Sequence, residues 1–132
     1  MTRFAIDAGI AVRLIRDGSD ADRRHQLVAP SVLRSQALSL LYRDVRAGTI
    51  AASAGRQQLE AVAAMKIRLL GDRVSRATAW RIAAELGWDD IGASEYLAVA
   101  SLQADAIVTD DDALASSASG IVRVAPYKEL AR

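Results

Sequence analysis

The sequence FAID at positions 4–7 and the sequence AIVTDD at positions 106–111 share one pattern, a short apolar run followed closely by aspartate. With loop and helix patterns on both sides, each run is typical of a short strand buried in a sheet. In open α/β sheets, ligands bind at the C-terminal edge of the strands. We therefore expect Asp7 and Asp111 to meet at that edge. Two carboxylates placed there can bind a hard divalent cation such as Mg²⁺.

The rest of the chain alternates between strand-like and helical patterns. Strand-like segments at 26–29 and 121–124, and a short apolar segment at 67–70, are separated by helical patterns at 8–16, 31–48, 51–65, 75–86, 89–103 and 112–116. Ser31 is expected to cap the helix that follows Pro30. The alternation predicts an α/β fold in which helices cover a central, mostly parallel sheet. No glycine-rich phosphate loop follows a strand, so a dinucleotide fold of the usual kind is not expected.

Composition narrows the class of protein. At 132 residues, with 52% hydrophobic residues and a formal net charge of +1, the chain is expected to form one globular domain over positions 1–132. Lys66 and Lys128 are the only lysines, so arginine, the better bidentate phosphate ligand, supplies nearly all positive charge. The absence of cysteine excludes disulfides and thiolate zinc sites. With no signal-like or membrane-length apolar segment, a cytoplasmic protein without membrane association is expected.

Several segments together resemble a known family. They are FAID at 4–7, APSVLRSQA at 29–37, AWRIA at 79–83, EYLAVA at 95–100 and AIVTDD at 106–111. Their order and spacing resemble those of PIN domains, and more specifically of the VapC toxins of VapBC toxin–antitoxin pairs. The resemblance covers nearly the whole chain and implies a single PIN-like, three-layer α/β/α domain.

The resemblance also implies an activity and partners. VapC toxins are metal-dependent endoribonucleases, in which three or four acidic residues bind Mg²⁺ or Mn²⁺ and a water is activated to attack RNA. Such a protein is silenced by a cognate antitoxin and commonly forms a homodimer. By this resemblance, Asp7 and Asp111 are the expected metal ligands.

Two acidic positions of the family pattern are altered in this chain. The helix after Pro30 carries Gln36 where the family has glutamate, and Ala93 stands where the family has aspartate, three residues before Tyr96. The Gln36 amide oxygen can still ligate a cation but carries no charge, so weak binding of Mg²⁺ or Mn²⁺ is expected. Asp90 is a candidate replacement ligand, which gives Asp7, Asp111, Gln36 and Asp90 as the expected catalytic set. The alternatives are a hydrogen-bonded helix glutamine at 36 and a helix-capping aspartate at 89 or 90.

The remaining candidates have ordinary structural alternatives. Arginines at 13, 16, 34 and 43 can line an RNA groove or form solvated helix faces. Trp80 and Trp88 are expected in the core, Tyr96 beneath the site, and Glu95 in solvent or in an ion pair.

Three functions stay open at this point. The first is a ribonuclease toxin with a reduced acidic site. The second is a catalytically inactive PIN-fold protein that binds an antitoxin, RNA or a second copy. The third is an unrelated α/β enzyme in which the two aspartates match the family by chance.

Overall fold

The computed structural model describes residues 1–131, in which five strands form a single sheet. All strand pairs are parallel, and the strand order is β3-β2-β1-β4-β5. The strands are β1 (Arg3–Ile6), β2 (Gln26–Pro30), β3 (Ile67–Leu70), β4 (Ala106–Val108) and β5 (Arg123–Val124). The two aspartate-terminated runs are therefore neighbouring strands, as predicted, with Ile6 in register with Val108.

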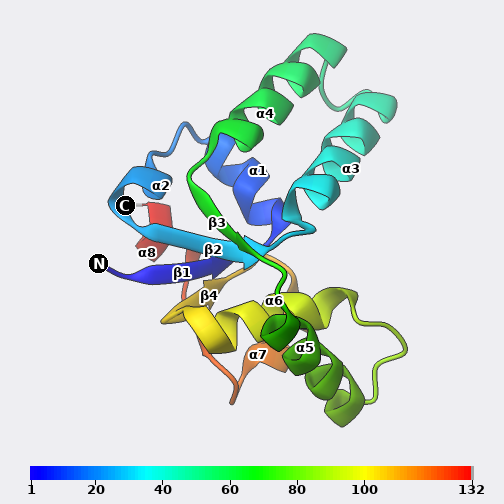
Figure 1. The fold of residues 1–132 in the computed structure, drawn as a ribbon. Helices are drawn as coiled ribbons and strands as arrows, with labels where there is room; N and C mark the ends of the chain where they lie inside the picture. The colour runs from blue at the N-terminus through cyan, green and yellow to red at the C-terminus, as the bar shows by residue number, and fades with distance from the viewer. Residues whose placement is uncertain (132) are drawn as a thin grey trace.

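Helices cover both faces of this sheet (Figure 1). On one face lie α1 (Ala8–Arg16), α3 (Leu33–Arg46) and α4 (Ala52–Ala64), and on the other α5 (Arg73–Leu86), α6 (Gly92–Gln103) and α7 (Asp112–Ala118). Two short helices, α2 (Ala21–Arg24) and α8 (Tyr127–Ala131), complete the described elements. The predicted α/β fold with three layers is confirmed.

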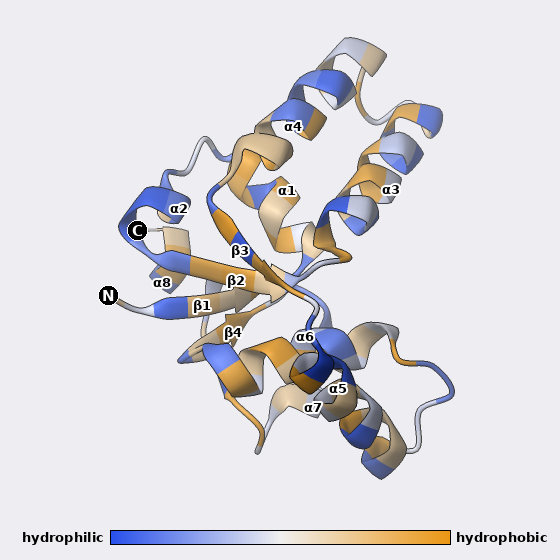
Figure 2. Ribbon diagram, in the orientation of Figure 1, coloured by the Kyte–Doolittle hydropathy of each residue, from blue (hydrophilic) through white to orange (hydrophobic). Residues whose placement is uncertain are grey.

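The strands are apolar because helices exclude water from both of their faces. Phe4, Ile6, Leu27 and Ile107 are at most 2% exposed, and Figure 2 shows apolar colour along most of β1, β2 and β4. The helices alternate between apolar and polar residues, as expected for elements with one face toward the sheet and one toward solvent. The polar residue Asp7 directly follows β1 and so lies at the C-terminal edge of the sheet.

The strand order creates a crevice between β1 and β4. After β1 the chain builds outward through β2 and β3, and it then returns to the other side of β1 to add β4 and β5. The helices that follow β1 and β4 lie on opposite faces of the sheet (Figure 1). Ligand sites in open α/β sheets form at such a switch point, beyond the C-terminal ends of the strands. Asp7 and Asp111 follow these two strands.

Several local expectations differ from the structure. Helix α3 begins at Leu33 with Val32 at its N-cap, and Ser31 does not cap it; instead the Ser31 backbone N–H donates to Leu70 O at 2.9 Å. Only Arg123 and Val124 of the predicted 121–124 strand pair with β4. Within residues 1–131, no helix has both the length and the apolar character needed to cross a bilayer.

The expectation that Trp80 lies in the core is also wrong, because Trp80 is 72% exposed. The inward stripe of α5 is formed by Ser75, Ala79, Ile82 and Ala83. One residue along a helix turns the side chain by about 100°, so Trp80 points away from that stripe. Trp88, by contrast, packs partly buried against the core.

Candidate functional site

Asp7 lies where β1 ends and α1 begins. Its Oδ1 accepts a hydrogen bond from the Ile10 backbone N–H at 3.0 Å, which caps the helix. Its Oδ2 accepts a hydrogen bond from the Thr109 hydroxyl at the end of β4. Each carboxylate oxygen keeps a further lone pair, since an ionised carboxylate has about four acceptor sites. Asp7 therefore does more than cap a helix, because it also joins the two central strands.

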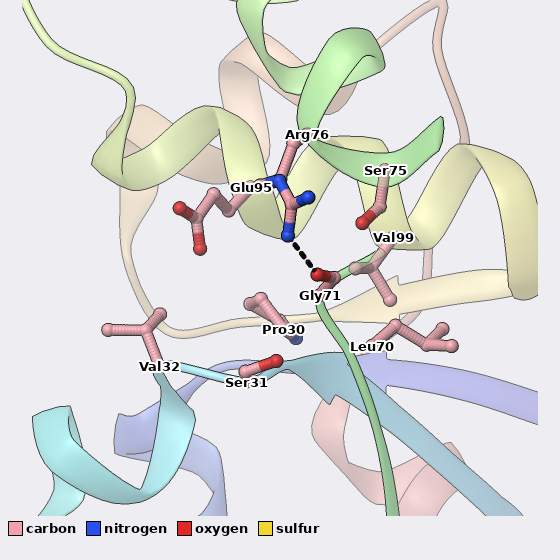
Figure 3. A pocket seen from close by; sticks show the side chains of 9 residues that line it. All are labelled: Pro30, Ser31, Val32, Leu70, Gly71, Ser75, Arg76, Glu95 and Val99. Carbon is pink, nitrogen blue, oxygen red and sulfur yellow. Dashed lines mark hydrogen bonds between the residues drawn. The ribbon is translucent and has the colours of Figure 1, made fainter. Parts of the chain in front are cut away.

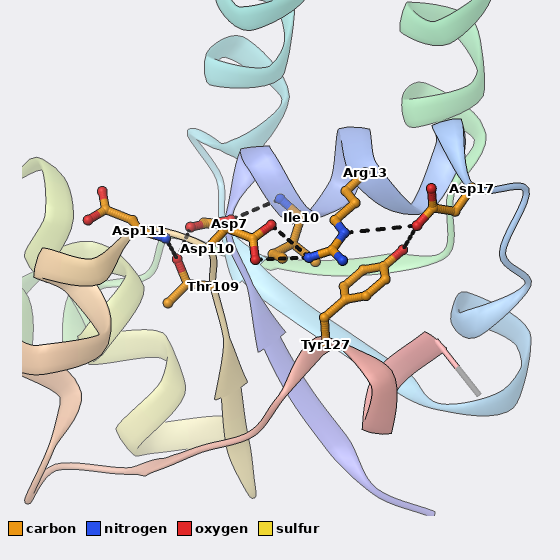
Figure 4. A network of polar contacts seen from close by, with 8 residues as sticks. All are labelled: Asp7, Ile10, Arg13, Asp17, Thr109, Asp110, Asp111 and Tyr127. Carbon is orange, nitrogen blue, oxygen red and sulfur yellow. Dashed lines mark hydrogen bonds and ion pairs between the residues drawn. The ribbon is translucent and has the colours of Figure 1, made fainter.

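Asp111 has a matching place after β4. Its Oδ1 accepts from the Leu114 backbone N–H at 3.1 Å and caps α7. Its own backbone N–H donates to Thr109 Oγ1 at 3.0 Å. The Thr109 hydroxyl thus contacts both expected metal ligands, the carboxylate of Asp7 and the main chain of Asp111 (Figure 4).

The electrostatics of Asp7 show that its charge is poorly solvated. Burial raises the pKa of Asp7 above its ordinary value, and the hydrogen bonds from Thr109 and Ile10 oppose that rise. The negative charges of Asp110 and Asp111 add to it. A carboxylate that is raised in pKa by burial and by like charges is stabilised by a cation placed beside it, and such groups concentrate at functional sites.

A cleft of about 560 Å³ opens at this point of the sheet edge. It brings together Asp7, Asp111 and Gln36, three of the four residues expected from the sequence. The cleft is lined by Asp7, Ala8, Gly9, Gln36, Ser39, Leu40, Arg43, Gly92, Ala93, Tyr96, Asp110, Asp111 and Leu114.

Gln36 is held by Tyr96, whose hydroxyl donates to Gln36 Oε1. Tyr96 is only 4% exposed, so it packs beneath the site as predicted. Burial raises the pKa of Tyr96, and the charges of Asp7 and Glu95 raise it further. The tyrosine therefore remains a neutral donor, and Gln36 has one remaining Oε1 lone pair and its Nε2 donors for a ligand.

The other altered position adds no ligand. Ala93 lines the cleft, and its methyl group cannot coordinate a cation. Asp90 does not line the cleft; its Oδ1 accepts from the Gly92 backbone N–H at 3.0 Å, within the turn that leads into α6. Its observed contact is therefore with its own turn, close to the capping alternative that the sequence left open.

Sequence reasoning missed a polar network beside the aspartates. Arg13 Nη1 donates to both carboxylate oxygens of Asp110, at 2.9 and 3.1 Å. The Arg13 guanidinium lies 3.6 Å from the ring centre of Tyr127, whose hydroxyl donates to Asp17 Oδ2 at 2.6 Å (Figure 4). Burial, followed by the contact with Asp17, raises the pKa of Tyr127 to about 12. The acidic run at 110–112 was the available signal, but nothing in the sequence pairs it with Arg13.

The arginines expected to line an RNA groove have different environments. Arg16 is bound to Asp44 at 2.6 Å and to Gln58 at 2.9 Å, while Arg34 Nη2 donates to the Ala63 and Met65 carbonyls. Arg43 alone of the four lines the cleft. It is the arginine best placed to meet a phosphate there.

The donor set limits how a metal can bind. Across residues 1–131 there is no group of three or more Asp, Glu, His or Cys side chains arranged to hold a metal ion. The cleft offers the carboxylates of Asp7 and Asp111 and the amide of Gln36, while the third carboxylate in its lining, that of Asp110, is bound by Arg13. Mg²⁺ is commonly held by one or two carboxylates together with waters and substrate phosphates. These residues therefore fit a cation retained with the help of a bound phosphate, and do not fit a cation enclosed by protein ligands.

Comparisons with known proteins support the fold. No protein-family profile matches the chain, and no curated protein sequence matches it. PAE2754 from Pyrobaculum aerophilum has a similar crystal structure, with a TM-score of 0.76, 21% identity, and coverage of 98% of this chain and 92% of that one. The crystal structure of VapBC2 from Rickettsia felis, which is bound to a DNA fragment from its promoter, is also similar. Its TM-score is 0.61 and its identity 11%, and the match covers 94% of this chain and 98% of that one. These likenesses show a PIN-like fold.

Proposed function

We propose that this protein is a divalent-cation-dependent endoribonuclease with a reduced acidic site, the toxin of a toxin–antitoxin pair. The observation that carries the proposal is that Asp7 and Asp111, which Thr109 joins, both line a cleft at the switch point of the sheet. The fold shared with VapBC2 supports the toxin assignment. Capping alone explains neither the Thr109 bridge nor the raised pKa of Asp7.

The polar residues in and beside the cleft have separate roles in this proposal. Asp7 and Asp111 would hold Mg²⁺ or Mn²⁺, which when bound supplies positive charge against the phosphate and lowers the pKa of water. Thr109 fixes the orientation of the Asp7 carboxylate. Arg43 can donate to phosphate oxygens, and the Nε2 of Gln36 can donate to the same group. Tyr96 keeps Gln36 turned toward the cleft.

A second candidate function is an inactive PIN-fold binding protein. It is favoured by the donor set itself, because Gln36 is uncharged and Ala93 supplies no ligand. Fewer carboxylates lower affinity for divalent cations. Such a protein would retain the cleft for RNA or keep the fold for a protein partner, without cleavage.

RNA cleavage separates the two functions. Purified protein is incubated with a panel of structured RNAs in Mg²⁺ or Mn²⁺, beside Asp7→Asn and a chelator control. Cleavage by the parent that is lost in Asp7→Asn supports the ribonuclease. Equal cleavage by both proteins indicates a contaminating nuclease. No cleavage by the parent, together with RNA binding in the same buffer, supports the binding function.

The proposed antitoxin has a surface on which it can dock. An apolar groove of about 260 Å³ lies between α3 and α4, with Leu41, Val45 and Leu59 among its lining residues. Leu38 and Tyr42 at this groove are 49% and 63% exposed. Amphipathic helices of partner proteins bind in grooves of this kind.

Co-purification tests this partner. A small reading frame beside the gene is co-expressed with the parent and with Leu38→Arg. The partner is expected to co-purify with the parent and to be lost from the variant, while Leu102→Arg, at a distant exposed leucine, should retain it. The homodimer expected from the resemblance stays a prediction. Sedimentation velocity of the isolated chain, which measures its oligomeric state, tests it.

A further inference from the structure

We propose that a second cavity, beside the aspartate cleft, is a subsite that binds a guanine base of the RNA. The cavity has a volume of about 370 Å³, within the range of roughly 300–1,000 Å³ that small-molecule sites occupy. It lies beyond the C-terminal ends of β2 and β3, between α5 and α6 (Figure 3). It is lined by Pro30, Ser31, Val32, Leu70, Gly71, Ser75, Arg76, Glu95 and Val99. The inference rests on the proposed RNA-directed function, whose cleft it extends.

The two cavities are lined by neighbouring residues of the same helices. Glu95 of the second cavity and Tyr96 of the aspartate cleft are consecutive residues of α6. Val32 and Gln36 line the second cavity and the cleft respectively, four residues apart at the start of α3. Residues four apart lie on the same side of a helix. An RNA with a phosphate in the aspartate cleft can therefore extend an adjacent nucleotide into the second cavity.

Glu95 places a carboxylate in this cavity that can accept hydrogen bonds from a ligand. Its side chain is half-buried, and within the described part of the chain its carboxylate has no hydrogen-bond or ion-pair partner. The alternative of an ion pair, left open by the sequence, is therefore not realised. A half-buried carboxylate without a partner gains stability from a ligand that donates hydrogen bonds.

Arg76 provides donors in the same cavity. Its Nη1 donates to the Gly71 carbonyl at 2.6 Å, which holds the guanidinium over the cavity (Figure 3). Its Nε and Nη2 remain to bind a ligand, because a guanidinium has five N–H donors. The cavity thus offers a carboxylate acceptor and a planar donor from two facing helices.

Guanine matches this pair of groups. Its Watson–Crick edge carries two adjacent N–H donors, at N1 and N2, which a carboxylate can accept together. Its O6 and N7 are acceptors that arginine commonly contacts. Adenine and cytosine each present one amino donor on that edge, and uracil presents one N–H between two carbonyls that would face the carboxylate. Glu95 therefore favours guanine over the other three bases.

The walls suit a flat apolar ring. Pro30, Val32, Leu70 and Val99 supply the apolar surface, as is usual in sites with few polar groups. Gly71 allows the backbone to close one side, because a Cβ added there would lie 2.2 Å from Ser31 Oγ. A larger residue at this position would displace the Ser31 side chain, which lines the same cavity.

Binding of short RNAs tests the subsite without requiring cleavage. Fluorescence anisotropy is measured in Mg²⁺ with labelled hexauridylate carrying one central guanosine, adenosine, cytidine or inosine. The guanosine probe is expected to bind the parent about tenfold more tightly than the adenosine probe, as one bidentate base contact provides. Inosine, which lacks the N2 amino group, is expected to fall between them. Glu95→Gln should remove the preference, and Arg76→Lys should weaken it because lysine lacks the planar fork.

Matched controls exclude effects of charge alone. Glu60→Gln on α4 removes the same charge, and Arg73→Lys makes the same exchange on α5 outside the cavity; both should retain the preference. Equal binding of the four probes, or an unchanged preference in Glu95→Gln, overturns the subsite. Guanosine-selective binding without cleavage supports the subsite while overturning the proposed ribonuclease. Cleavage without any base preference would support the proposed ribonuclease and overturn the subsite.

Discussion

The Thr109 hydroxyl donates a hydrogen bond to the Asp7 carboxylate, although the two residues lie 102 positions apart in the sequence. The contact joins the ends of β1 and β4, the strands on either side of the switch point. The same oxygen accepts from the Asp111 backbone N–H at 3.0 Å. One threonine side chain therefore contacts both the carboxylate of Asp7 and the main chain that carries Asp111.

Replacing Thr109 with valine tests this role. Thr109→Val keeps the size of the side chain but removes both hydrogen bonds, and a hydrogen bond to a charged group contributes about 1.5–3 kcal/mol. We expect the free energy of unfolding at neutral pH, measured in urea, to fall by about 2 kcal/mol. The pKa of Asp7 should rise further, because Thr109 lowers it in the parent. Thr109→Ser retains the hydroxyl and should lose much less stability; equal losses in the two variants would show that the methyl group, not the hydroxyl, matters.

Asp7 should cost the folded protein stability when no cation is present. In the folded state, burial raises the pKa of Asp7 above the ordinary value of 3.8, so protonation of Asp7 favours folding. That contribution is complete below pH 3.8 and is lost as the pH rises through the raised pKa. In chelator at pH 7, Asp7→Asn is therefore expected to melt a few degrees higher than the parent, as about 1 kcal/mol produces in a domain of this size. The difference should shrink toward pH 4, and a lower melting temperature at pH 7 would mean that the Thr109 and Ile10 hydrogen bonds outweigh burial.

The sequence predicted the fold from its buried strands because a parallel sheet with both faces covered demands continuous apolar runs. Phe4 and Ile107 belong to such runs, and they lie in neighbouring strands of the core. The expectation that Trp80 lies in the core was wrong because apolar character alone does not decide burial. Ala79 and Ile82 form the inward face of α5, and the helical period places Trp80 off that face. The end strand β5 is exposed and short, so little apolar pattern marks its true bounds.

Only the part of the site that depends on strand order was predictable from the sequence. Asp7 and Asp111 follow clear strands, and their meeting depends only on strand order. The contacts of Arg13 with Asp110 and of Tyr127 with Asp17 join residues 97 and 110 positions apart, and they depend on how α1 and α8 pack. Asp90 was expected in the cleft by distance along the chain, but its turn contact with Gly92 satisfies it locally.

Restoring two carboxylates should make the cleft depend on metal. Gln36→Glu with Ala93→Asp adds two negative charges to residues that line the same cleft as Asp7. Without metal these charges repel one another, and burial also disfavours them, so the melting temperature in chelator should fall. Mg²⁺ or Mn²⁺ should raise it again by binding the folded state. Differential scanning fluorimetry across a metal titration measures both effects.

The parent and a matched variant complete that comparison. Gln57→Glu with Ala63→Asp makes the same two exchanges on α4, outside the cleft, and should show no metal-dependent recovery. RNA cleavage gained by the double cleft variant from an inert parent would identify Gln36 and Ala93 as the cause of inactivity. A double cleft variant whose stability does not respond to metal would contradict the placement of the cation between these residues.

Arg13 should weaken cation binding by neutralising a third carboxylate. Its guanidinium donates to both oxygens of Asp110, which lines the cleft with Asp7 and Asp111. Arg13→Gln removes that positive charge and leaves Asp110 free to face a cation, so affinity for Mn²⁺ measured by calorimetry should rise about fivefold. Arg16 lies on the same helix as Arg13 but away from the cleft, and Arg16→Gln, which breaks its ion pair with Asp44 of α3, should leave affinity unchanged. Adding Asp110→Asn to Arg13→Gln should abolish the gain; a gain that persists would mean that Arg13 acts by its charge alone, without releasing Asp110.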